Sequence, residues 1–322
     1  MPSPSFADRS LGAFWGLALG DAYGRTLEFV TGSAVRTRPV SVAPGDFMWT
    51  DDTHMSLYLA LAILDQPPGR LEREAFGNAV GRRYVEWMRD PLTPSTAPGG
   101  TCLRGAAAFA RHGDWGRSGD RGSDGSGAVM RVCPLPIALQ GEDLSRGAYV
   151  SSVVTHAHPN AIEAAMAAAH MLREALETGV FDAGVVGRAV EGLRGPWSRG
   201  GFVADALEAA VGWARQRTGD WLDEPAIPDG GGGWRSASAL GLGVAAALRW
   251  GEDFATAVEK AARIQGDSDS VACLTGMFLG GAGGVAVLPP AWVGALPQAD
   301  HIRQMTARLV SWSKLLPPAP AS

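Results

Sequence analysis

The feature that most constrains the fold is a series of alanine-rich segments in which small and apolar residues recur at helical spacing. These segments are 11–24, 55–66, 160–179, 204–219, 238–251 and 253–266. Alanine has the highest helix propensity, and glycine is the residue that most often follows the last turn of a helix. The predicted helix ends are Gly24, Gly179, Gly219, Gly251 and Gly266. The pattern therefore predicts a protein built mainly from helices.

Strand patterns, by contrast, are nearly absent. The best candidate, 35–44, is short and is broken by Pro39, and proline interrupts the hydrogen bonds of a sheet. A chain of 322 residues with 46% hydrophobic content can bury a large core. We predict an all-α fold with a single domain over residues 1–322, whose core extends from about residue 10 to about residue 315 between flexible termini.

The overall charge argues against nucleic acid as a partner. Charged residues make up 19% of the chain, the formal net charge is -5, and no basic stripe occurs. The three cysteines, Cys102, Cys133 and Cys273, are widely spaced and form no CxxC pair. A disulfide framework or a cysteine zinc site is therefore not expected, and free thiols in a reducing compartment are the simpler interpretation.

One uncharged segment, 271–288, approaches the length that crosses a bilayer. It is rich in glycine and ends at Pro289 and Pro290, so we interpret it as a buried helix followed by a loop. The N-terminus lacks the basic region of a signal peptide. We expect a soluble, cytoplasmic protein that contacts no membrane and is a monomer.

Two acidic clusters stand at the starts of apolar helical patterns. The first is Thr50-Asp51-Asp52, and the second is 267–270, which reads Asp-Ser-Asp-Ser. Taken singly, either cluster has two explanations. Its side chains could cap a helix N-terminus, where hydroxyl and carboxylate oxygens accept free backbone N–H groups, or they could bind a ligand.

Taken together, the clusters favour a metal site. If the two helix starts meet in space, four carboxylates share one pocket, and such a pocket is untenable without cations. Oxygen ligands with no cysteine and no necessary histidine suit the hard cations Mg²⁺ and Mn²⁺ better than zinc. Two such ions form a familiar hydrolytic arrangement.

Several motifs resemble those of the ADP-ribosylglycohydrolase family, which includes the dinitrogenase-reductase-activating glycohydrolase. In chain order they are GLALGDAYGRTLEF, WTDDTHMSL, APGGTCL, SGAVMRVCPL, THAHP and GDSDSVA. DDTHM combined with GDSDS is specific, whereas either motif alone is weak. The resemblance covers most of the chain and implies an all-α fold with a binuclear Mg²⁺ or Mn²⁺ centre at the base of a cleft.

The resemblance also assigns roles to individual residues. The implied metal ligands are Thr50, Asp51, Asp52, Asp267, Asp269 and Ser270, where Ser270 replaces the threonine common in the family. Ser268 is expected to point elsewhere. The implied reaction is hydrolysis of the glycosidic bond at the anomeric carbon of ADP-ribose, with Glu28 as acid/base or gate residue and Asp269 as a second catalytic residue. Asp21 is either functional or a structural acid at a helix end.

The substrate is expected to contact two glycine-rich loops and a histidine. The candidates are Gly99, Gly100, Thr101, Ser126, Gly127, Met130 and His156. Gly-rich backbone approaches phosphate oxygens closely. Thr155 is expected to cap the helix that follows, and the role of His158 is left open. Arg131 has two interpretations, a phosphate contact or a buried tie between helices. Trp49, Trp115 and Trp234 are alternative stacking partners for adenine.

Two departures from the family pattern concern the base and the substrate. Ala97 stands where the dinitrogenase-reductase-activating branch has an acid, and Ser126 stands where many members have asparagine. ADP-ribosyl-arginine on a protein is the first choice of substrate, and serine-linked ADP-ribose and O-acetyl-ADP-ribose remain open. A non-catalytic ADP-ribose or nucleotide binding protein and a two-metal nucleotide phosphoesterase are the alternative functions.

Overall fold

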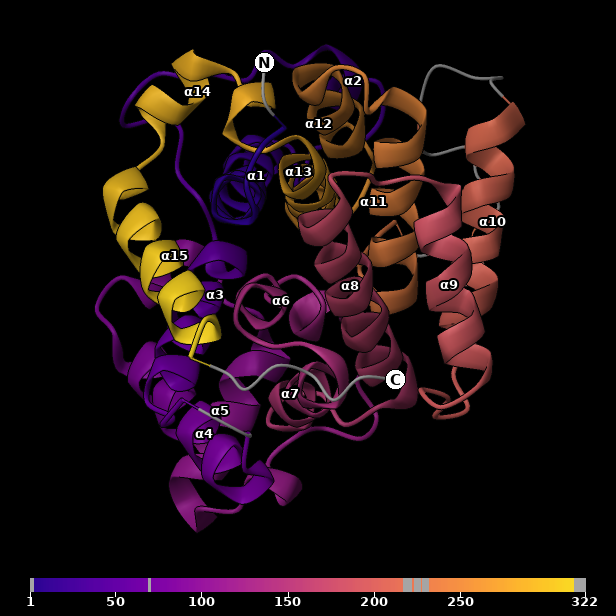
Figure 1. The fold of residues 1–322 in the computed structure, drawn as a ribbon. Coiled ribbons are helices and arrows are strands. Elements are labelled where there is room, and N and C mark those ends of the chain that lie inside the picture. Colours follow the sequence, from indigo (N-terminus) through magenta and orange to yellow (C-terminus); the bar gives the residue numbers. More distant parts are fainter. Residues whose placement is uncertain (1–2, 69–70, 217–221, 223–226, 228–231, 316–322) are drawn as a thin grey trace.

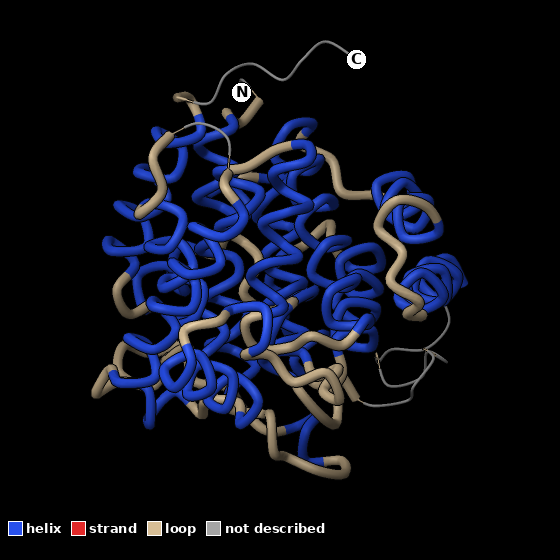
Figure 2. The backbone as a smooth tube through the Cα atoms, turned by 90° about the horizontal axis from the view of Figure 1, so that it is seen from below, coloured by secondary structure: helices blue, strands red, loops and turns tan. Residues whose placement is uncertain are grey.

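The computed structural model describes residues 3–68, 71–216, 222, 227 and 232–315, and this part of the chain is helical and contains no strand (Figures 1 and 2). The helices of the first half are α1 (Phe6–Arg25), α2 (Ala34–Thr37), α3 (Asp51–Leu64), α4 (Arg73–Arg89), α5 (Gly100–His112), α6 (Pro134–Ala138) and α7 (Gly141–Val153). Those of the second half are α8 (Pro159–Thr178), α9 (Ala183–Arg194), α10 (Val203–Gln216), α11 (Ser236–Trp250), α12 (Phe254–Ala262), α13 (Ser268–Gly283), α14 (Pro290–Ala295) and α15 (Ala299–Ser313). The predicted all-α fold class is confirmed.

An antiparallel pair, α1 and α13, lies at the centre of the molecule (Figure 1). Small residues repeat every fourth position on both helices and face one another. The facing pairs are Gly12 with Gly280, Gly16 with Gly276, Gly20 with Ala272, and Gly24 with Ser268. A Cβ atom on Gly16 would lie 2.2 Å from the carbonyl oxygen of Gly276, and a Cβ on Gly276 would lie 2.1 Å from that of Gly16. The two backbones therefore touch, and a glycine on at least one of the two helices permits this approach at each pair.

This pairing determines what lies at one end of the two helices. Because the pair is antiparallel, the end of α1 lies beside the start of α13, where the Ser268 hydroxyl donates to the Gly24 carbonyl oxygen over 3.0 Å. Ser268 thus points away from its acidic neighbours, as expected. The loop that follows α1 and the second acidic cluster consequently lie at the same end of the pair.

The remaining helices surround this pair. In Figure 1, α3 and α15 lie on one side, α8, α9, α10 and α11 lie on the other, and α4, α5 and α7 lie below. Helix α1 also packs against α12 and α15, and α13 packs against α8, α11 and α12. The central pair is therefore enclosed, and every residue of α13 from Ser268 to Gly281 is buried.

The predicted helix ends agree with the structure at Gly179 and Gly251, which follow α8 and α11. Two others were wrong. Helix α1 continues through Gly24, which instead packs against α13, and α12 ends at Ala262, before Gly266. Gly219 lies outside the described residues. The strand candidate 35–44 begins in the short helix α2 and forms no strand.

The uncharged segment 271–288 forms most of α13 and the turn after it, as predicted. Across the residues that the structure describes, no helix combines the length and the hydropathy required to cross a membrane.

Candidate active site

The first acidic cluster forms the start of α3. Thr50 is the N-cap residue, and its hydroxyl accepts from the backbone N–H of Asp52 over 3.3 Å. Two further N–H groups are satisfied by Asp21 of α1, which accepts from Thr50 N at 2.8 Å and from Thr53 N at 3.0 Å. Asp21 also accepts from the Thr53 hydroxyl. These bonds attach α3 to α1 and leave the side chains of Asp51 and Asp52 with no role in capping α3. Oδ2 of Asp51 instead accepts from the backbone N–H of Gly99 over 3.0 Å.

The second acidic cluster forms the start of α13, and here capping does not explain the residues. Asp267 occupies the N-cap position, yet its side chain makes no capping hydrogen bond. It accepts instead from the Ser126 hydroxyl at 2.6 Å. Two carboxylate oxygens, Oδ2 of Asp52 and Oδ1 of Asp269, are buried and have no hydrogen-bond partner in the part of the chain that the structure describes. Burial of a carboxylate oxygen without a hydrogen-bond partner costs free energy. The two acidic clusters are therefore suited to binding a ligand.

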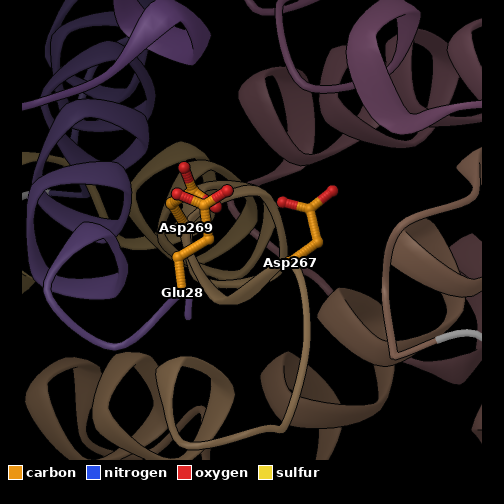
Figure 3. A group of neighbouring side chains, drawn as sticks. All are labelled: Glu28, Asp267 and Asp269. Carbon is orange, nitrogen blue, oxygen red and sulfur yellow. The ribbon is translucent and has the colours of Figure 1, made fainter. Parts of the chain in front are cut away.

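Glu28 joins the second cluster from the loop after α1. Figure 3 shows its carboxylate beside those of Asp267 and Asp269, and one oxygen of each lies within 4.8 Å of the others. The α1–α13 pairing causes this proximity, because Glu28 follows the end of α1 and the two aspartates stand at the start of α13. Asp51 and Asp52 line the same cavity.

The electrostatics of the site follow from burial and like charge. We call the set Asp21, Glu28, Asp51, Asp52, Asp267 and Asp269 the acidic cluster. Burial, together with the charges of neighbouring carboxylates, raises the pKa of Asp21 to about 7 and those of Glu28 and Asp51 to about 8. The same causes raise the pKa values of Asp52 and Asp267 well above the ordinary range. Without nearby positive charge, these carboxylates can stay buried together only if several of them are protonated.

The donor set fits hard divalent cations. The carboxylates and hydroxyls of the two clusters supply only oxygen atoms, which Mg²⁺ and Mn²⁺ prefer. The two buried oxygens without partners, on Asp52 and Asp269, come one from each cluster, and both residues line the same cavity, so cations bound there would satisfy them. The residues present therefore fit the metal that the sequence suggested.

The cavity above the acidic cluster has a volume of about 290 Å³. It is lined by Glu28, Asp51, Asp52, Ala97, Gly99, Gly100, Thr101, Cys102, Gly125, Ser126, Gly127, Met130, His156, Trp234, Asp267, Asp269 and Ser270. Every predicted site residue except Thr50 is among them. Thr50 is fully buried at the start of α3, directly before Asp51.

Some of the open alternatives are now decided. Arg131 is buried and binds the carbonyl oxygens of Gly127 and Ser151, so it ties helical segments together and does not reach the cavity.

The predicted capping role of Thr155 is wrong, because His158 is the N-cap of α8 and accepts from Asn160 N at 3.2 Å. His158 takes this role because it directly precedes Pro159, the first residue of α8, and its backbone has the extended conformation that an N-cap requires.

The structure also separates the three tryptophans. Trp49 and Trp115 are buried, and their indole N–H groups donate to Pro297 O and to Glu74 respectively. Trp234 lines the cavity with 46% of its surface exposed. Its ring stacks on that of Phe29, which is 74% exposed, with centroids 6.0 Å apart. Of the three, only Trp234 is placed to meet a ligand.

Two residues at the site carried little or no signal in the sequence. Asp21 sits within an apolar helical pattern, and its capping of a distant helix could not be read from local spacing. Phe29 directly follows Glu28, and an aromatic residue in a loop is as compatible with the core as with the surface. Its exposure and its stacking on Trp234, which lines the cavity, are what distinguish it.

Comparisons with known proteins show the family of this chain. The family model for ADP-ribosylglycohydrolase matches residues 2–315. The chain belongs to the ADP-ribosylglycohydrolase family. It is therefore a hydrolase of the class that cleaves ADP-ribosyl glycosidic bonds.

Three relatives of this ADP-ribosylglycohydrolase are informative. An ADP-ribosylarginine hydrolase, Tri1, of Pseudomonas putida is 28% identical over 328 residues, covering 94% of this chain and 78% of its own. The ADP-ribosyl-[dinitrogen reductase] glycohydrolase of Rhodospirillum rubrum is 31% identical over 172 residues, 49% of this chain and 55% of its own. A solved structure described as an ADP-ribosylglycohydrolase-related protein complex superimposes with a TM-score of 0.72 at 27% identity, covering 96% of this chain and 99% of that one.

Proposed function

We propose that this protein hydrolyses the glycosidic bond of ADP-ribosyl-arginine on proteins, in a reaction that depends on two Mg²⁺ or Mn²⁺ ions. The ligands would be Thr50, Asp51, Asp52, Asp267, Asp269 and Ser270. The observation that carries the metal dependence is the pair of buried oxygens without partners on Asp52 and Asp269, one in each acidic cluster.

The reaction requires one bond to break and one to form. The bond between the anomeric carbon and the leaving nitrogen breaks, and a water oxygen bonds to that carbon. The water loses one proton, and the leaving nitrogen gains one, so that the guanidinium product forms. Divalent cations, when bound, supply positive charge that lets the carboxylates ionise together and polarises substrate and water oxygens. The protein must supply the proton transfer.

Glu28 is the proposed proton carrier. Its side chain is only partly buried, whereas Asp51, Asp52, Asp267 and Asp269 are buried. Burial is the largest cause that raises the pKa of Glu28 above its ordinary value, and it acts with or without bound cations. A carboxyl group with a raised pKa can both donate and accept a proton near neutral pH. Ala97 lines the cavity without a carboxylate, so it cannot take this role.

The arginine linkage is supported by charge and by similarity. A guanidinium leaving group is cationic, and Glu28 at the cavity wall can accept its N–H groups and attract its charge. Two relatives that cover over nine-tenths of this chain are ADP-ribosylarginine hydrolases. Serine-linked and O-acetyl substrates present no positive charge at this position.

The nucleotide half of the substrate would extend toward Trp234. Adenine stacks on aromatic rings, and Trp234 offers an exposed face at the cavity. The diphosphate would then pass the start of α5 at Gly100 and Thr101, since the N–H of the preceding Gly99 already donates to Asp51. Backbone N–H groups at a helix start bind phosphate oxygens.

The proposal is tested by release of ADP-ribose from an arginine-ADP-ribosylated peptide, with Mg²⁺, Mn²⁺ or EDTA. Asp267→Asn is the informative variant and Asp253→Asn is its matched control. Both aspartates are N-cap residues, of α13 and α12, but only Asp253 makes a capping bond, to Thr256 N at 2.7 Å. Asparagine caps helices as well as aspartate does, so the control changes no cap and no site.

We expect metal-dependent release of intact ADP-ribose that is lost in Asp267→Asn and retained in Asp253→Asn. Release of AMP would refute the glycosidic reaction in favour of a phosphoesterase. Activity on a serine-linked substrate alone would refute the arginine assignment. Equal activity in EDTA and Mg²⁺ would refute the metal.

A further inference from the structure

A buried arginine lies behind the cavity wall and has no part in the reaction described above. Arg131 is 1% exposed, and its guanidinium lies over the ring of Tyr84, 4.6 Å from the centroid. One of its terminal nitrogens donates to Ser151 O at 3.0 Å and to the Thr155 hydroxyl at 2.6 Å. Arginine stays protonated in proteins and has no acceptor. The Thr155 oxygen must therefore be the acceptor in this contact.

This contact decides where the Thr155 hydroxyl hydrogen goes. A threonine hydroxyl has a single hydrogen, and Arg131 uses one of the lone pairs of the oxygen. The remaining polar neighbour of the Thr155 oxygen among the described residues is Nδ1 of His156, at 2.9 Å. A buried hydroxyl that left its hydrogen unpaired would cost free energy. Thr155 therefore donates to His156 Nδ1.

The consequence for the imidazole is a single tautomer. A neutral imidazole has one N–H and one acceptor nitrogen. Since Nδ1 accepts from Thr155, the hydrogen is on Nε2. Burial and the nearby Arg131 lower the pKa of His156 to about 3, so the ring is neutral at physiological pH. The ring lines the cavity, and Nε2 has no protein partner within the described ranges.

Two glycines make room for this ring. A Cβ atom on Gly127 would lie 2.7 Å from His156 Cε1 and 3.3 Å from Nε2, and a Cβ on Gly125 would lie 3.5 Å from Nε2. The Gly127 carbonyl oxygen also accepts from Arg131. The same loop therefore holds the arginine and leaves the Nε2 edge of the imidazole uncovered.

We propose that Arg131 and Thr155 are positioning residues which hold His156 as a neutral Nε2–H donor directed at an oxygen of the bound ADP-ribosyl group. In this arrangement His156 is neither a general base nor a metal ligand, because both roles require a free lone pair on Nε2. The identity of the ligand rests on the proposed function, whereas the tautomer is a property of the free protein.

The tautomer is tested by long-range ¹H–¹⁵N correlation spectra of the full chain labelled at histidine nitrogens, recorded near pH 7 with Mg²⁺. The His156 signal is assigned from its loss in His156→Gln or, should that variant not fold, from nuclear Overhauser contacts to Thr155. We expect a pyrrole-type Nε2 and a pyridine-type Nδ1. The reverse pattern, or a charged ring, overturns the inference whether or not the protein hydrolyses anything.

The positioning role is tested by the dissociation constant of ADP-ribose, which is measured without turnover. Thr155→Val removes the hydroxyl and is expected to weaken binding about tenfold, the effect of one lost hydrogen bond. Thr155→Ser keeps the hydroxyl and is expected to bind as the unchanged protein does. His156→Leu should weaken binding about tenfold, and His156→Gln, whose amide can place N–H near the Nε2 position, should bind within about threefold.

Equal binding by Thr155→Val and the unchanged protein overturns the positioning role. Equal binding by His156→Leu overturns the donor. If the unchanged protein binds no ADP-ribose, the proposed function fails, and the spectra still decide the tautomer.

Discussion

A single methyl group at the contact between α1 and α13 is predicted to destabilise the whole fold. Gly16→Ala would place a Cβ atom 2.2 Å from the carbonyl oxygen of Gly276. Ordinary contacts of this kind begin at 3.4 Å, so the backbones must separate by the difference, 3.4 − 2.2 = 1.2 Å. The obstacle is main chain on both sides, and no side chain can turn away to relieve it.

The magnitude follows from two opposing effects. Overpacking of a well-packed interface costs about 3 kcal/mol, and a gap of this size also weakens the neighbouring dispersion contacts. Alanine in place of glycine favours a helix by about 1 kcal/mol. The net prediction is a loss of about 2 kcal/mol, or a Tm lower by about 4 °C.

Gly212→Ala is the matched control. Gly212 lies within α10 and is exposed, and an added Cβ would meet no described atom within 4 Å. Only the propensity effect remains there, so we expect a gain of about 1 kcal/mol. Urea unfolding followed by circular dichroism, with thermal unfolding beside it, compares the two variants.

The prediction also concerns activity. Moving α1 away from α13 moves Glu28 away from Asp267 and Asp269, so hydrolysis by folded Gly16→Ala should fall while that of Gly212→Ala is unchanged. If Gly16→Ala were as stable as the unchanged protein, or more so, the helices would not be in backbone contact, and the reasoning about the origin of the site would fail with it.

Three further predictions follow from the site. In EDTA, Tm is expected to fall from about pH 4.5 to about pH 8 and to level off above that. The pKa of Asp21 is raised to about 7 and those of Glu28 and Asp51 to about 8, so over this range the folded state holds protons that the unfolded state has lost. The stabilisation by these protons is complete below the unfolded pKa values and is lost by the time pH has risen through the folded ones. A Tm that rises or stays constant over that range, measured by scanning calorimetry, would contradict it. Asp21→Asn removes an acceptor from the start of α3 and should weaken Mg²⁺ binding in calorimetry about 10- to 100-fold; unchanged affinity would show that α3 positions its ligands without Asp21. Trp234→Ala should weaken ADP-ribose binding by about 1–3 kcal/mol but leave binding of ribose 5-phosphate, which has no adenine, unchanged, and equal losses for both ligands would place the base elsewhere.

The sequence by itself determined the helical class and the chemical nature of the site. Helical periodicity and alanine content are local properties, so 160–179 and 238–251 could be recognised as helices without knowledge of their neighbours. The carboxylates and hydroxyls of Thr50, Asp51 and Asp52 are equally visible in the chain, and oxygen chemistry alone indicates a hard cation. Resemblance to a family then supplied the reaction class.

Other features depended on contacts between distant segments. Whether an aspartate at a helix start caps the helix or binds a ligand is decided by what its oxygens meet. Asp267 is the telling case, because it occupies the capping position and bonds to Ser126 instead. The choice of Trp234 over Trp49 and Trp115 likewise depended on exposure, which is a property of the packed molecule.

The register of α1 against α13 decided the most. Glycines repeat at fourfold spacing in both segments of the sequence, but nothing local states that Gly16 faces Gly276 or that the helices are antiparallel. Backbone contact restricts that register, because a side chain at Gly16 or Gly276 would place a Cβ atom against a carbonyl oxygen of the facing helix. The register brings Glu28 to Asp267 and Asp269 across more than two hundred residues of chain. The residues of the site were thus present in the sequence, and close packing of two helices made them one site.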